Sequence, residues 1–464
     1  MGTTMTPKGA IPPILVDALN TPDGYVIVLS GEPGTGKSML AREVFMFTQD
    51  SFMILTSQEC CSASGERFVD SPDWESRHVA IKTTHTDTGE RVQSTDMGDV
   101  LSVFVTDKRQ VRDARVIIID SWSELVETLH EPQRRRFEKE LLVAAREQKK
   151  KLVIVSEDGQ QLVDSRALHY SADSIIRLEK HRRDERVFRQ LVIEKMRWFP
   201  VPQDSYLFTL DGGRFTYIPW HQHTYPPITV EREPIPDPSA SRISTGNRSL
   251  DRLTGGGFIK GTLNLIEVED LAAPYLETIY IPFLSNNLQL GRPAVILLPE
   301  GWSPERLTHG LEHFMDLSSA TDRLVYFGRH ALGRGGNVKP IDDDPAKAIQ
   351  EIRYETGRLE REYGCPATDL FALDTLENKY GPSVVKGMVA ELTAALYGTG
   401  RVTLTILSHH QSVKAQSLSH SVHLRVEELC GVISVAGINP RSNFLALRPL
   451  LSAGFLDYEL TPIV

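Results

Sequence analysis

The sequence predicts an α/β protein of two tandem domains, each a mainly parallel sheet covered by helices on both faces. Three observations lead to this prediction. The chain has 464 residues, which is too long for one compact core. Apolar runs of strand length alternate with helical patterns in the first half, and a similar order returns in the second half. A proline-rich segment separates the two halves.

That segment, YPPITVEREPIPDPSASR, holds five prolines and has neither helical nor strand periodicity. Such a composition is typical of a stiff, extended linker. We therefore expect a first domain over residues 1–225, a linker over 226–242 and a second domain over 243–464. The repeated order of elements indicates a divergent tandem duplication.

The apolar runs give the expected elements of each half. Strands in the first half are expected at 25–30, 52–57, 116–120, 151–156 and 174–178, with helices at 38–47 and 136–148. Strands in the second half are expected at 263–270, 294–300, 369–374, 403–408 and 423–429, with helices at 277–291 and 384–398. This alternation favours parallel strands joined by helical crossovers.

Composition excludes several classes of protein. Hydrophobic residues make up 41% and charged residues 24% of the chain, and no apolar stretch is long enough to span a bilayer. The N-terminus lacks the features of a secretory signal, so we expect a cytoplasmic protein that does not contact a membrane. The four cysteines lack CxxC spacing, which favours reduced thiols. A net charge of −10 argues against a large nucleic-acid surface.

One motif indicates chemistry directly. It has the pattern GxxxxGKS, directly after an apolar strand and directly before a helix, and consists of Gly31, Glu32, Pro33, Gly34, Thr35, Gly36, Lys37 and Ser38, followed by Met39. In that context the backbone N–H groups surround phosphates and the helix presents its positive end. We expect these nine residues to bind a nucleoside triphosphate, with Lys37 at the β and γ phosphates and Ser38 at magnesium. The predicted cofactors are ATP and Mg²⁺.

Two carboxylates are candidates for the remaining roles. Asp120 ends the predicted strand VIIID, where it would hold magnesium directly or through water; the alternative is a cap for the following helix. Glu59 follows the strand FMILTS, beside Gln58, and is our candidate for the base that activates the attacking water. The alternative for Glu59 is a solvated loop carboxylate.

These motifs resemble the RecA-like ATPases of the KaiC, RadA and GvpD group. The resemblance lies in GYVIVLSGEPGTGKSMLA, FMILTSQE and VIIIDSW, and in a late strand pair that ends in the K-x-R of EKMRWFP. It implies two tandem RecA-like P-loop domains. The family carries paired glutamates after its second strand, and here the pair is Gln58 and Glu59, so only Glu59 takes the role of the base by resemblance.

The resemblance also implies assembly. In KaiC-like hexamers the K-x-R residues act in trans on the γ-phosphate of the neighbouring subunit, which assigns that role here to Lys195 and Arg197. The alternative is two exposed residues on one face of a strand. We therefore expect a homo-oligomer, with a hexameric ring as the form that the resemblance suggests. The lead-in before the phosphate loop lacks the T-G-x-x-x-L-D opening and resembles the GvpD branch, whose members act as regulators.

The second half resembles the family only at its opening, STGNRSLDRLTGGGFIKGTLNLIE. Where a phosphate loop should follow, the chain has VEDLAAPYLET, which lacks glycine and lysine and places Glu269 and Asp270 where phosphates would be repelled. We expect a degenerate domain that binds no nucleotide in the usual way. Asp374 ends LFALD like a magnesium carboxylate but has no phosphate loop to serve, which favours a structural or partner-binding role.

A basic run, Arg134, Arg135 and Arg136, lies in a helical stretch that also holds acids. Such runs are commonly solvated helix faces. The resemblance to GvpD adds the alternative that these arginines bind an acidic protein partner, and direct DNA binding ranks third.

Together these observations predict a slow magnesium-dependent ATPase that acts as a nucleotide-driven regulatory switch. Two alternatives stay open. The first is an ATP-gated regulator or scaffold without turnover, which Gln58 in place of the first glutamate favours. The second is a DNA-acting relative of RecA and RadA, against which the acidic composition argues.

Overall fold

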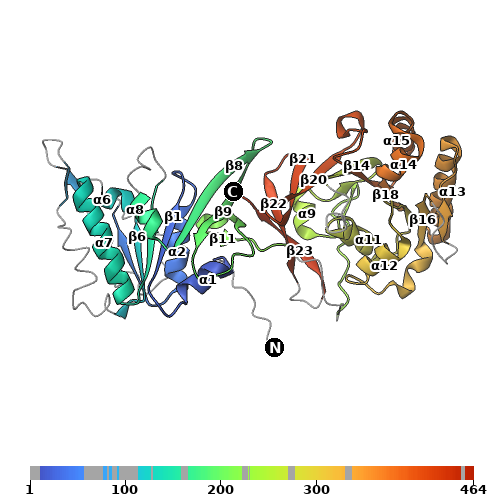
Figure 1. The fold of residues 1–464 in the computed structure, drawn as a ribbon. Coiled ribbons are helices and arrows are strands. Elements are labelled where there is room, and N and C mark those ends of the chain that lie inside the picture. Colours follow the sequence, from blue (N-terminus) through green and yellow to red (C-terminus); the bar gives the residue numbers. More distant parts are fainter. Residues whose placement is uncertain are drawn as a thin grey trace. The chain divides into compact units, whose positions relative to one another are not determined.

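The computed structural model describes residues 11–56, 77–80, 83–85, 91–93, 113–126, 129–157, 166–221, 228, 230–269, 277–329, 337–450 and 455–464. The chain forms two compact units (Figure 1). The first unit comprises Met1–Pro219 together with Ile463–Val464, and the second comprises Trp220–Pro462. The first unit thus ends six positions before the boundary expected at 225, and it includes two residues from the far end of the chain that the sequence did not assign to it.

The first unit is built on a nine-stranded sheet of order β11-β10-β9-β8-β1-β7-β6-β2-β3. Its strands are β1 (Tyr25–Ser30), β2 (Ser51–Leu55), β3 (His78–Ala80), β6 (Val116–Asp120), β7 (Lys151–Val155), β8 (Ser174–Arg183), β9 (Arg186–Met196), β10 (Ser205–Thr209) and β11 (Thr216–Tyr217). The neighbouring strands β3, β2, β6, β7, β1 and β8 pair in parallel. The neighbouring strands β8, β9, β10 and β11 pair antiparallel. The short strands β4 (Thr83–His85) and β5 (Arg91–Gln93) form a separate antiparallel pair.

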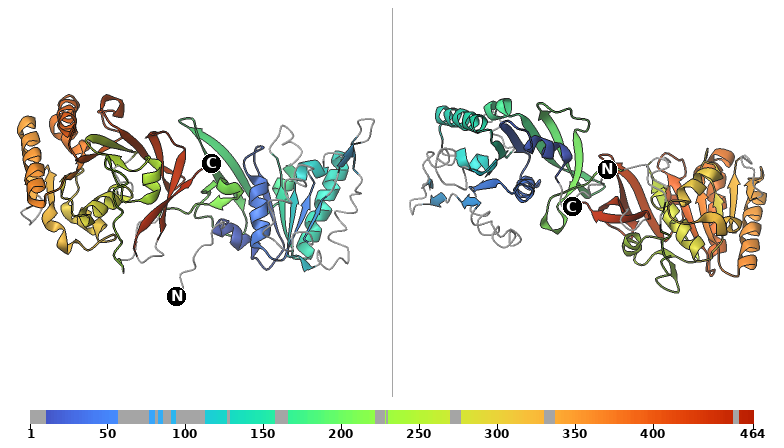
Figure 2. Two further views of the ribbon diagram at one scale, coloured as in Figure 1. Left: turned by 180° about the vertical axis from the view of Figure 1, so that it is seen from behind. Right: turned by 90° about the horizontal axis from the view of Figure 1, so that it is seen from below.

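Helices cover both faces of this sheet (Figures 1 and 2). They are α1 (Pro13–Leu19), α2 (Lys37–Phe47), α6 (Trp122–Val126), α7 (Glu131–Glu147) and α8 (Arg166–Ser171). Because side chains alternate along a strand, Ile27 and Leu29 of β1 join the cluster that contains α1 and α2. Val26 and Val28 join the opposite cluster with α6 and α7. Burial on both faces explains why β1 is apolar along its whole length.

The second unit has a ten-stranded sheet of order β17-β16-β15-β18-β19-β14-β20-β21-β22-β23. Its strands are β14 (Thr262–Val268), β15 (Ala294–Leu297), β16 (Leu324–Gly328), β17 (Val338–Pro340), β18 (Thr368–Ala372), β19 (Val402–Ser408), β20 (Val422–Leu429), β21 (Val432–Asn439), β22 (Phe444–Leu450) and β23 (Asp457–Pro462). A small pair, β12 (Arg242–Ile243) and β13 (Phe258–Ile259), precedes this sheet in the chain. The neighbouring strands β17, β16, β15, β18, β19, β14 and β20 pair in parallel. The neighbouring strands β20, β21, β22 and β23 pair antiparallel.

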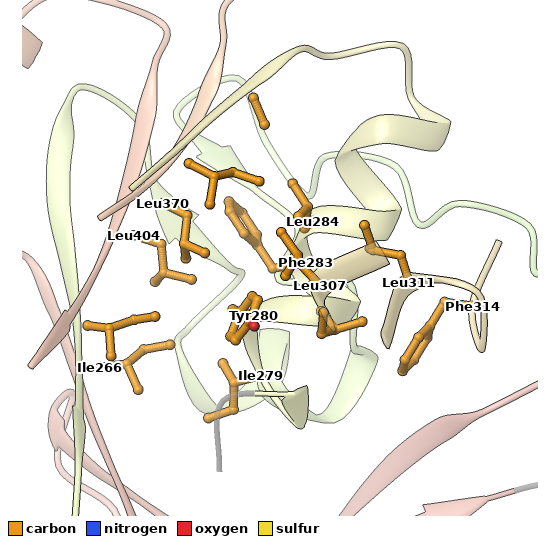
Figure 3. Close-up of a cluster of buried hydrophobic side chains, with 14 of the residues drawn as sticks. Ile266, Ile279, Tyr280, Phe283, Leu284, Leu307, Leu311, Phe314, Leu370 and Leu404 are labelled. Carbon is orange, nitrogen blue, oxygen red and sulfur yellow. The ribbon is translucent and has the colours of Figure 1, made fainter. Parts of the chain in front are cut away.

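The helices of the second unit also divide between the two faces. They are α9 (Arg248–Leu253), α11 (Tyr280–Gln289), α12 (Pro304–Leu311), α13 (Pro345–Tyr363), α14 (Leu373–Tyr380) and α15 (Pro382–Leu396). Figure 3 shows one cluster, in which Tyr280 and Phe283 of α11 and Leu307 of α12 lie on the same side as Ile266 of β14. The opposite cluster contains Leu263 of β14 with residues of α13, α14 and α15.

The two sheets share one plan, which confirms the predicted fold class of tandem RecA-like domains. In the first unit β1 lies between β7 and β8, and three antiparallel strands extend the sheet beyond β8. In the second unit β14 lies between β19 and β20, and three antiparallel strands likewise extend the sheet beyond β20. The order β2-β6-β7-β1-β8 therefore corresponds to β15-β18-β19-β14-β20, with β14 in the place of the strand that precedes the phosphate loop.

The proline-rich segment packs against α11 of the second unit. The side chain of Asn286 on α11 accepts from the N–H of Ile235 at 2.7 Å and donates to its carbonyl at 3.0 Å. The buried Arg232 donates to the carbonyl of Gly246 at 2.8 Å. The two bonds of Asn286 satisfy backbone groups of Ile235 that a proline-rich stretch does not pair within itself, and the bond of Arg232 ties the segment to Gly246.

Among the described residues, no helix is both long enough and apolar enough to cross a membrane.

Candidate functional site

The loop between β1 and α2 needs its glycines for steric reasons. Gly31 has φ +143°, and a Cβ there would lie 2.3 Å from the carbonyl oxygen of Leu178 on β8. Gly36 caps α2 at φ +108°, where a Cβ would lie 3.1 Å from the side chain of Leu210. No atom of a described residue lies within 4 Å of a Cβ at Gly34. The loop is thus confined by backbone at Gly31 and by a side chain at Gly36, and the position of Gly34 between them is open.

Lys37 lies in the first turn of α2 and is only 5% exposed. Its Nζ donates to the carbonyl oxygens of Gly31 and Glu32, each at 2.8 Å. Thr35 also donates to the Glu32 carbonyl, from its hydroxyl, at 2.9 Å. The ammonium is therefore held over the loop at the N-terminal end of α2, where the helix dipole and the free N–H groups favour an anion.

Ser38 and Asp120 come together, as a shared cation would require. Strand β6 places Asp120 at its C-terminal end, and Ser38 Oγ donates to Asp120 Oδ1 at 3.1 Å. Asp120 is 2% exposed, and its second oxygen, Oδ2, is buried without a hydrogen-bond partner among the described residues. A hydroxyl and a carboxylate with a spare oxygen are the hard oxygen donors that magnesium takes, so these residues fit the ion.

Burial shifts the pKa of this carboxylate. It raises the pKa of Asp120 above the ordinary value of 3.8, although the hydrogen bond from Ser38 and the charges of Arg42 and Lys37 act in the opposite direction. A cation bound beside Asp120 would add to that opposing influence and stabilise the ionised form.

Thr56 belongs to the site, although the sequence analysis did not identify it. Its hydroxyl donates to the carbonyl of Ser121 and accepts from the N–H of Ser121, both at 2.8 Å. Its own N–H donates to the carbonyl of Asp120 at 2.9 Å. These bonds join the end of β2 to the end of β6 and so orient Asp120. The available signal was a hydroxyl residue at the end of the strand that neighbours VIIID.

Gln58 and Glu59 lie outside the described residues, so the role of Glu59 as the base stays a prediction. Strand β2 runs beside β6 in parallel, with Leu55 opposite Asp120, and Glu59 follows β2 by four residues.

Lys195 and Arg197 contact the segment around α8. Lys195 Nζ donates to the carbonyl oxygens of His169 and Tyr170 at 3.1 and 2.9 Å. Arg197 pairs with Asp173 at 3.6 Å and is 43% exposed at its side chain. Their action on a neighbouring subunit is not tested by these contacts and stays a prediction.

The three arginines of the basic run lie on α7, and each pairs with a glutamate of the same helix. Arg134 Nε is 3.2 Å from Glu138, Arg136 Nε is 2.7 Å from Glu140, and Arg135 pairs with Glu131. The pairs of Arg135 and Arg136 are exposed, as on a solvated helix face, whereas Arg134 and Glu138 are largely buried. Binding of an acidic partner by these arginines stays a prediction.

In the second unit, Asp374 bonds to a neighbouring turn through Oδ2, and its other oxygen, Oδ1, is buried without a hydrogen-bond partner among the described residues. It lies in the first turn of α14, directly after β18, the counterpart of β6. Its Oδ2 accepts from the N–H of Glu300 at 2.8 Å, and the neighbouring Thr375 donates to the carbonyl of Leu298 at 2.7 Å. These bonds fix the turn after β15.

The counterpart of β1 ends in an ionic cluster. Glu267 of β14 lies 3.2 Å from both His423 and Arg425 of β20 and 3.4 Å from His409. The hydrogen bond with His423 and the charge of Arg425 lower the pKa of Glu267 to about 2, although burial acts to raise it. Among the described residues, no group of three or more His, Cys, Asp or Glu could hold a metal ion.

Comparison with known proteins agrees with this geometry. Residues 17–221, which include the loop, Asp120 and Arg197, match the family model described as "ATPase: KaiC". Protein GvpD2 of Halobacterium salinarum is 30% identical over 220 residues, covering 45% of this chain and 42% of that protein. Protein GvpD1 of the same organism is 25% identical over 351 residues, covering 72% of this chain and 64% of that protein.

The match therefore spans less than two thirds of the length of either relative. Within that limit, the family model, the two relatives and the RecA-like plan of both sheets agree with the resemblance found in the sequence. Residues 17–221 are thus identified as a KaiC-like ATPase domain of the RecA-like P-loop group, and the chain as a whole is similar to the GvpD proteins.

Proposed function

We propose that this protein is a slow, magnesium-dependent ATPase whose nucleotide state switches its contacts with other proteins. The observation that supports the proposal most strongly is the contact of 3.1 Å between Ser38 and Asp120, with the second oxygen of Asp120 buried and unpaired among the described residues. A buried carboxylate oxygen without a partner costs free energy unless a ligand satisfies it. A magnesium ion beside the phosphates would do so.

Each residue of the loop has a separate task in this proposal. Backbone N–H groups of the loop, to which Pro33 contributes none, bind the phosphates, and Lys37 exchanges its carbonyl acceptors for the β and γ oxygens. Magnesium, held by Ser38 and Asp120, would supply charge compensation at the phosphates. Met39 lies partly buried against the apolar cluster beneath α2, which anchors the helix behind the loop.

Hydrolysis also requires a base and a compensating positive charge at the γ-phosphate. We assign the base to Glu59, which follows β2, and the charge to Lys195 and Arg197 of a neighbouring copy. Trp198 and Tyr170, next to these two cations, are each 83% exposed. Exposed aromatic side chains beside arginine are typical of protein interfaces, which supports assembly into a homo-oligomer such as a hexameric ring.

The switch follows from the degenerate second unit. It keeps the RecA-like sheet, while Glu269 occupies the region of the missing phosphate loop and Asp374 fixes a turn. A domain that keeps the fold without the nucleotide site is suited to transmit a state and to bind a partner. We therefore place the regulatory contacts on the second unit or on α7.

The test is ATP hydrolysis with light scattering on the same samples, for the wild type, Lys37→Ala and Glu59→Gln, each with and without magnesium. We expect turnover only in the wild type with magnesium, and an ATP-dependent increase in mass. Lys37→Ala should abolish binding as well, whereas Glu59→Gln should bind ATP normally. Equal turnover in the wild type and Lys37→Ala would refute the proposal.

A second candidate function is an ATP-gated scaffold without turnover, in the cytoplasm as in the first proposal. The observation that favours it is Gln58 at the first position of the family's glutamate pair. Tight ATP binding by the wild type, without phosphate release over hours and without a change in mass, would select this function.

A further inference from the structure

Arg189 of β9 joins the phosphate loop to residues that lie far away in the sequence. Its Nη1 donates to the carbonyl oxygen of Gly34 at 3.1 Å, and its Nε donates to the main-chain oxygen of Val464 at 3.0 Å. The same oxygen of Val464 accepts from the N–H of Leu210 at 3.3 Å. The side chain of Leu210 packs against Gly36. We call Arg189, Leu210 and Val464 the loop support.

The loop support contacts the phosphate loop at two points. Gly36 is confined by Leu210, whereas Gly34 has φ +77° and open space where a Cβ would lie. The bond from Arg189 therefore acts on the less confined part of the loop. A guanidinium is suited to this task because its planar fork holds two acceptors at once, which a lysine ammonium on a flexible stem does not reproduce.

Ile463 and Val464 hold the support in place. Ile463 is fully buried, and the N–H of Val464 donates to the Thr209 hydroxyl at 3.4 Å. Both residues belong to the first unit, yet they directly follow β23, the edge strand of the second sheet. Residues 463–464 thus link the support of the phosphate loop covalently to the second unit.

We infer that Arg189 is a positioning residue for the phosphate loop, and that docking of residues 463–464 fixes its position, so that nucleotide affinity and this docking depend on each other. The inference rests on the proposed nucleotide binding at this loop. Coupling of this kind is reciprocal: whatever undocks residues 463–464 weakens the nucleotide, and the nucleotide strengthens the docking.

The first measurement is the affinity for a fluorescent ATP analogue with magnesium, by titration of the full chain. The variants are Arg189→Ala, Arg189→Lys and Ile463→Ser, with Arg182→Ala, on an exposed position of β8, as the matched control. We expect Arg189→Ala to weaken binding about tenfold, as for loss of one charge-assisted hydrogen bond. Arg189→Lys and Ile463→Ser should weaken binding by a similar factor, and Arg182→Ala should match the wild type.

A double variant separates positioning from general destabilisation. Because Arg189 and Ile463 act through one link, Arg189→Ala with Ile463→Ser should bind little worse than either single variant. Effects that multiply would overturn the inference, and so would a lower melting temperature of Arg189→Ala with unchanged affinity. If Arg189→Ala does not fold, the double variant is made with Arg189→Lys and compared with its two single variants in the same way.

Hydrogen exchange tests the support without nucleotide, which separates this inference from the proposed function. Peptides that cover 31–38 should exchange faster in Arg189→Ala and Ile463→Ser than in the wild type and Arg182→Ala. If they do so in a protein that binds no ATP, the proposed function fails and the loop support stands. In the opposite outcome, the wild type binds ATP and Lys37→Ala does not, but the Arg189 and Ile463 variants change neither hydrogen exchange nor affinity. The inference alone then fails. Added MgATP should slow hydrogen exchange of residues 457–464 in the wild type. It should have no such effect in Arg189→Ala.

Discussion

Burial raises the pKa of Asp120, whereas a magnesium ligand has to be an ionised carboxylate. Burial and ionisation thus compete at Asp120, because a bound cation would satisfy its buried Oδ2 and the oxygen has no other partner among the described residues. The protonation of Asp120 should therefore control how much magnesium contributes to nucleotide affinity.

We predict that the gain in ATP affinity on adding magnesium declines on acidification at a pH above 3.8, the ordinary pKa of an aspartate. The sign follows from the raised pKa: as the pH falls, Asp120 takes up its proton earlier than an exposed aspartate does. The measurement is the dissociation constant without magnesium divided by that with magnesium, between pH 4 and 8, with Asp120→Asn as the reference because residue 120 then does not ionise. In that variant the ratio should drop by about 10- to 100-fold at neutral pH and follow only the titration of ATP itself.

Loss of the magnesium effect at the same pH in both proteins would show that Asp120 does not hold the ion.

The free energy of unfolding depends on pH in the opposite direction to the magnesium effect. Since the folded pKa is the higher one, Asp120 lowers the free energy of unfolding as the pH rises through that pKa, and Asp120→Asn should remove this loss.

Single residues also show where the sequence was informative. Lys37, Ser38 and Asp120 were predicted because a local motif and a strand end fix their places. Arg189 and Thr56 were not identified, because their contacts join segments far apart in the chain. An arginine within a strand carries no local signal, and the hydroxyl of Thr56 becomes informative only once β2 is known to lie beside β6. Glu59 lies outside the described residues and stays a prediction.

Among the elements, the phosphate loop offers a matched pair of glycines. Both Gly31 and Gly34 have positive φ, but a Cβ at Gly31 would lie 2.3 Å from the Leu178 carbonyl, and a Cβ at Gly34 would meet open space. We predict that Gly31→Ala lowers the free energy of unfolding by roughly 3 kcal/mol or more, because strain adds to a clash with backbone. Gly34→Ala should cost only about 1 kcal/mol. Urea unfolding of both variants measures the difference.

The same pair should differ in function. Gly31→Ala should lose ATP binding, since the loop has to move away from β8 to admit the methyl group. Equal stability and equal affinity of the two variants would mean that the approach of Gly31 to Leu178 is not a constraint on the loop.

Elements were predicted well where burial acts on both faces and less well where other contacts decide. The strands β1, β6 and β7 appear as uninterrupted apolar runs because the sheet is covered on both sides. The proline-rich segment was expected to be a linker from composition alone. Its packing depends on Asn286 of α11, whose amide pairs with the backbone of Ile235, and a contact of that kind has no signature within the segment.

For the whole molecule, the tandem plan predicts one nucleotide per chain. The second sheet repeats the first, but the phosphate loop is missing from its sequence, and Asp374 is bonded to a turn instead. Equilibrium titration with MgATP should give a stoichiometry of one, and Lys37→Ala should reduce it to zero. A residual site of unchanged affinity in Lys37→Ala would locate nucleotide binding in the second unit.

The duplication itself was visible in the sequence because both halves repeat the same order of strands and helices. The assignment of residues 463–464 to the first unit was not visible, since an isoleucine and a valine after a strand give no indication of which core receives them.

That assignment makes the second unit an insertion within the first, between Pro219 and Ile463. A ribosome adds residues from the N-terminus onward, so the phosphate loop is made early and Ile463, which completes its support, is added only after the whole second unit has been synthesised. A nascent chain can form most of the first sheet at once, yet it closes that core only when the inserted unit is already in place. Completion of the ATP site is thus tied to the order of synthesis, and a chain arrested before residue 463 would carry the motif without its full support.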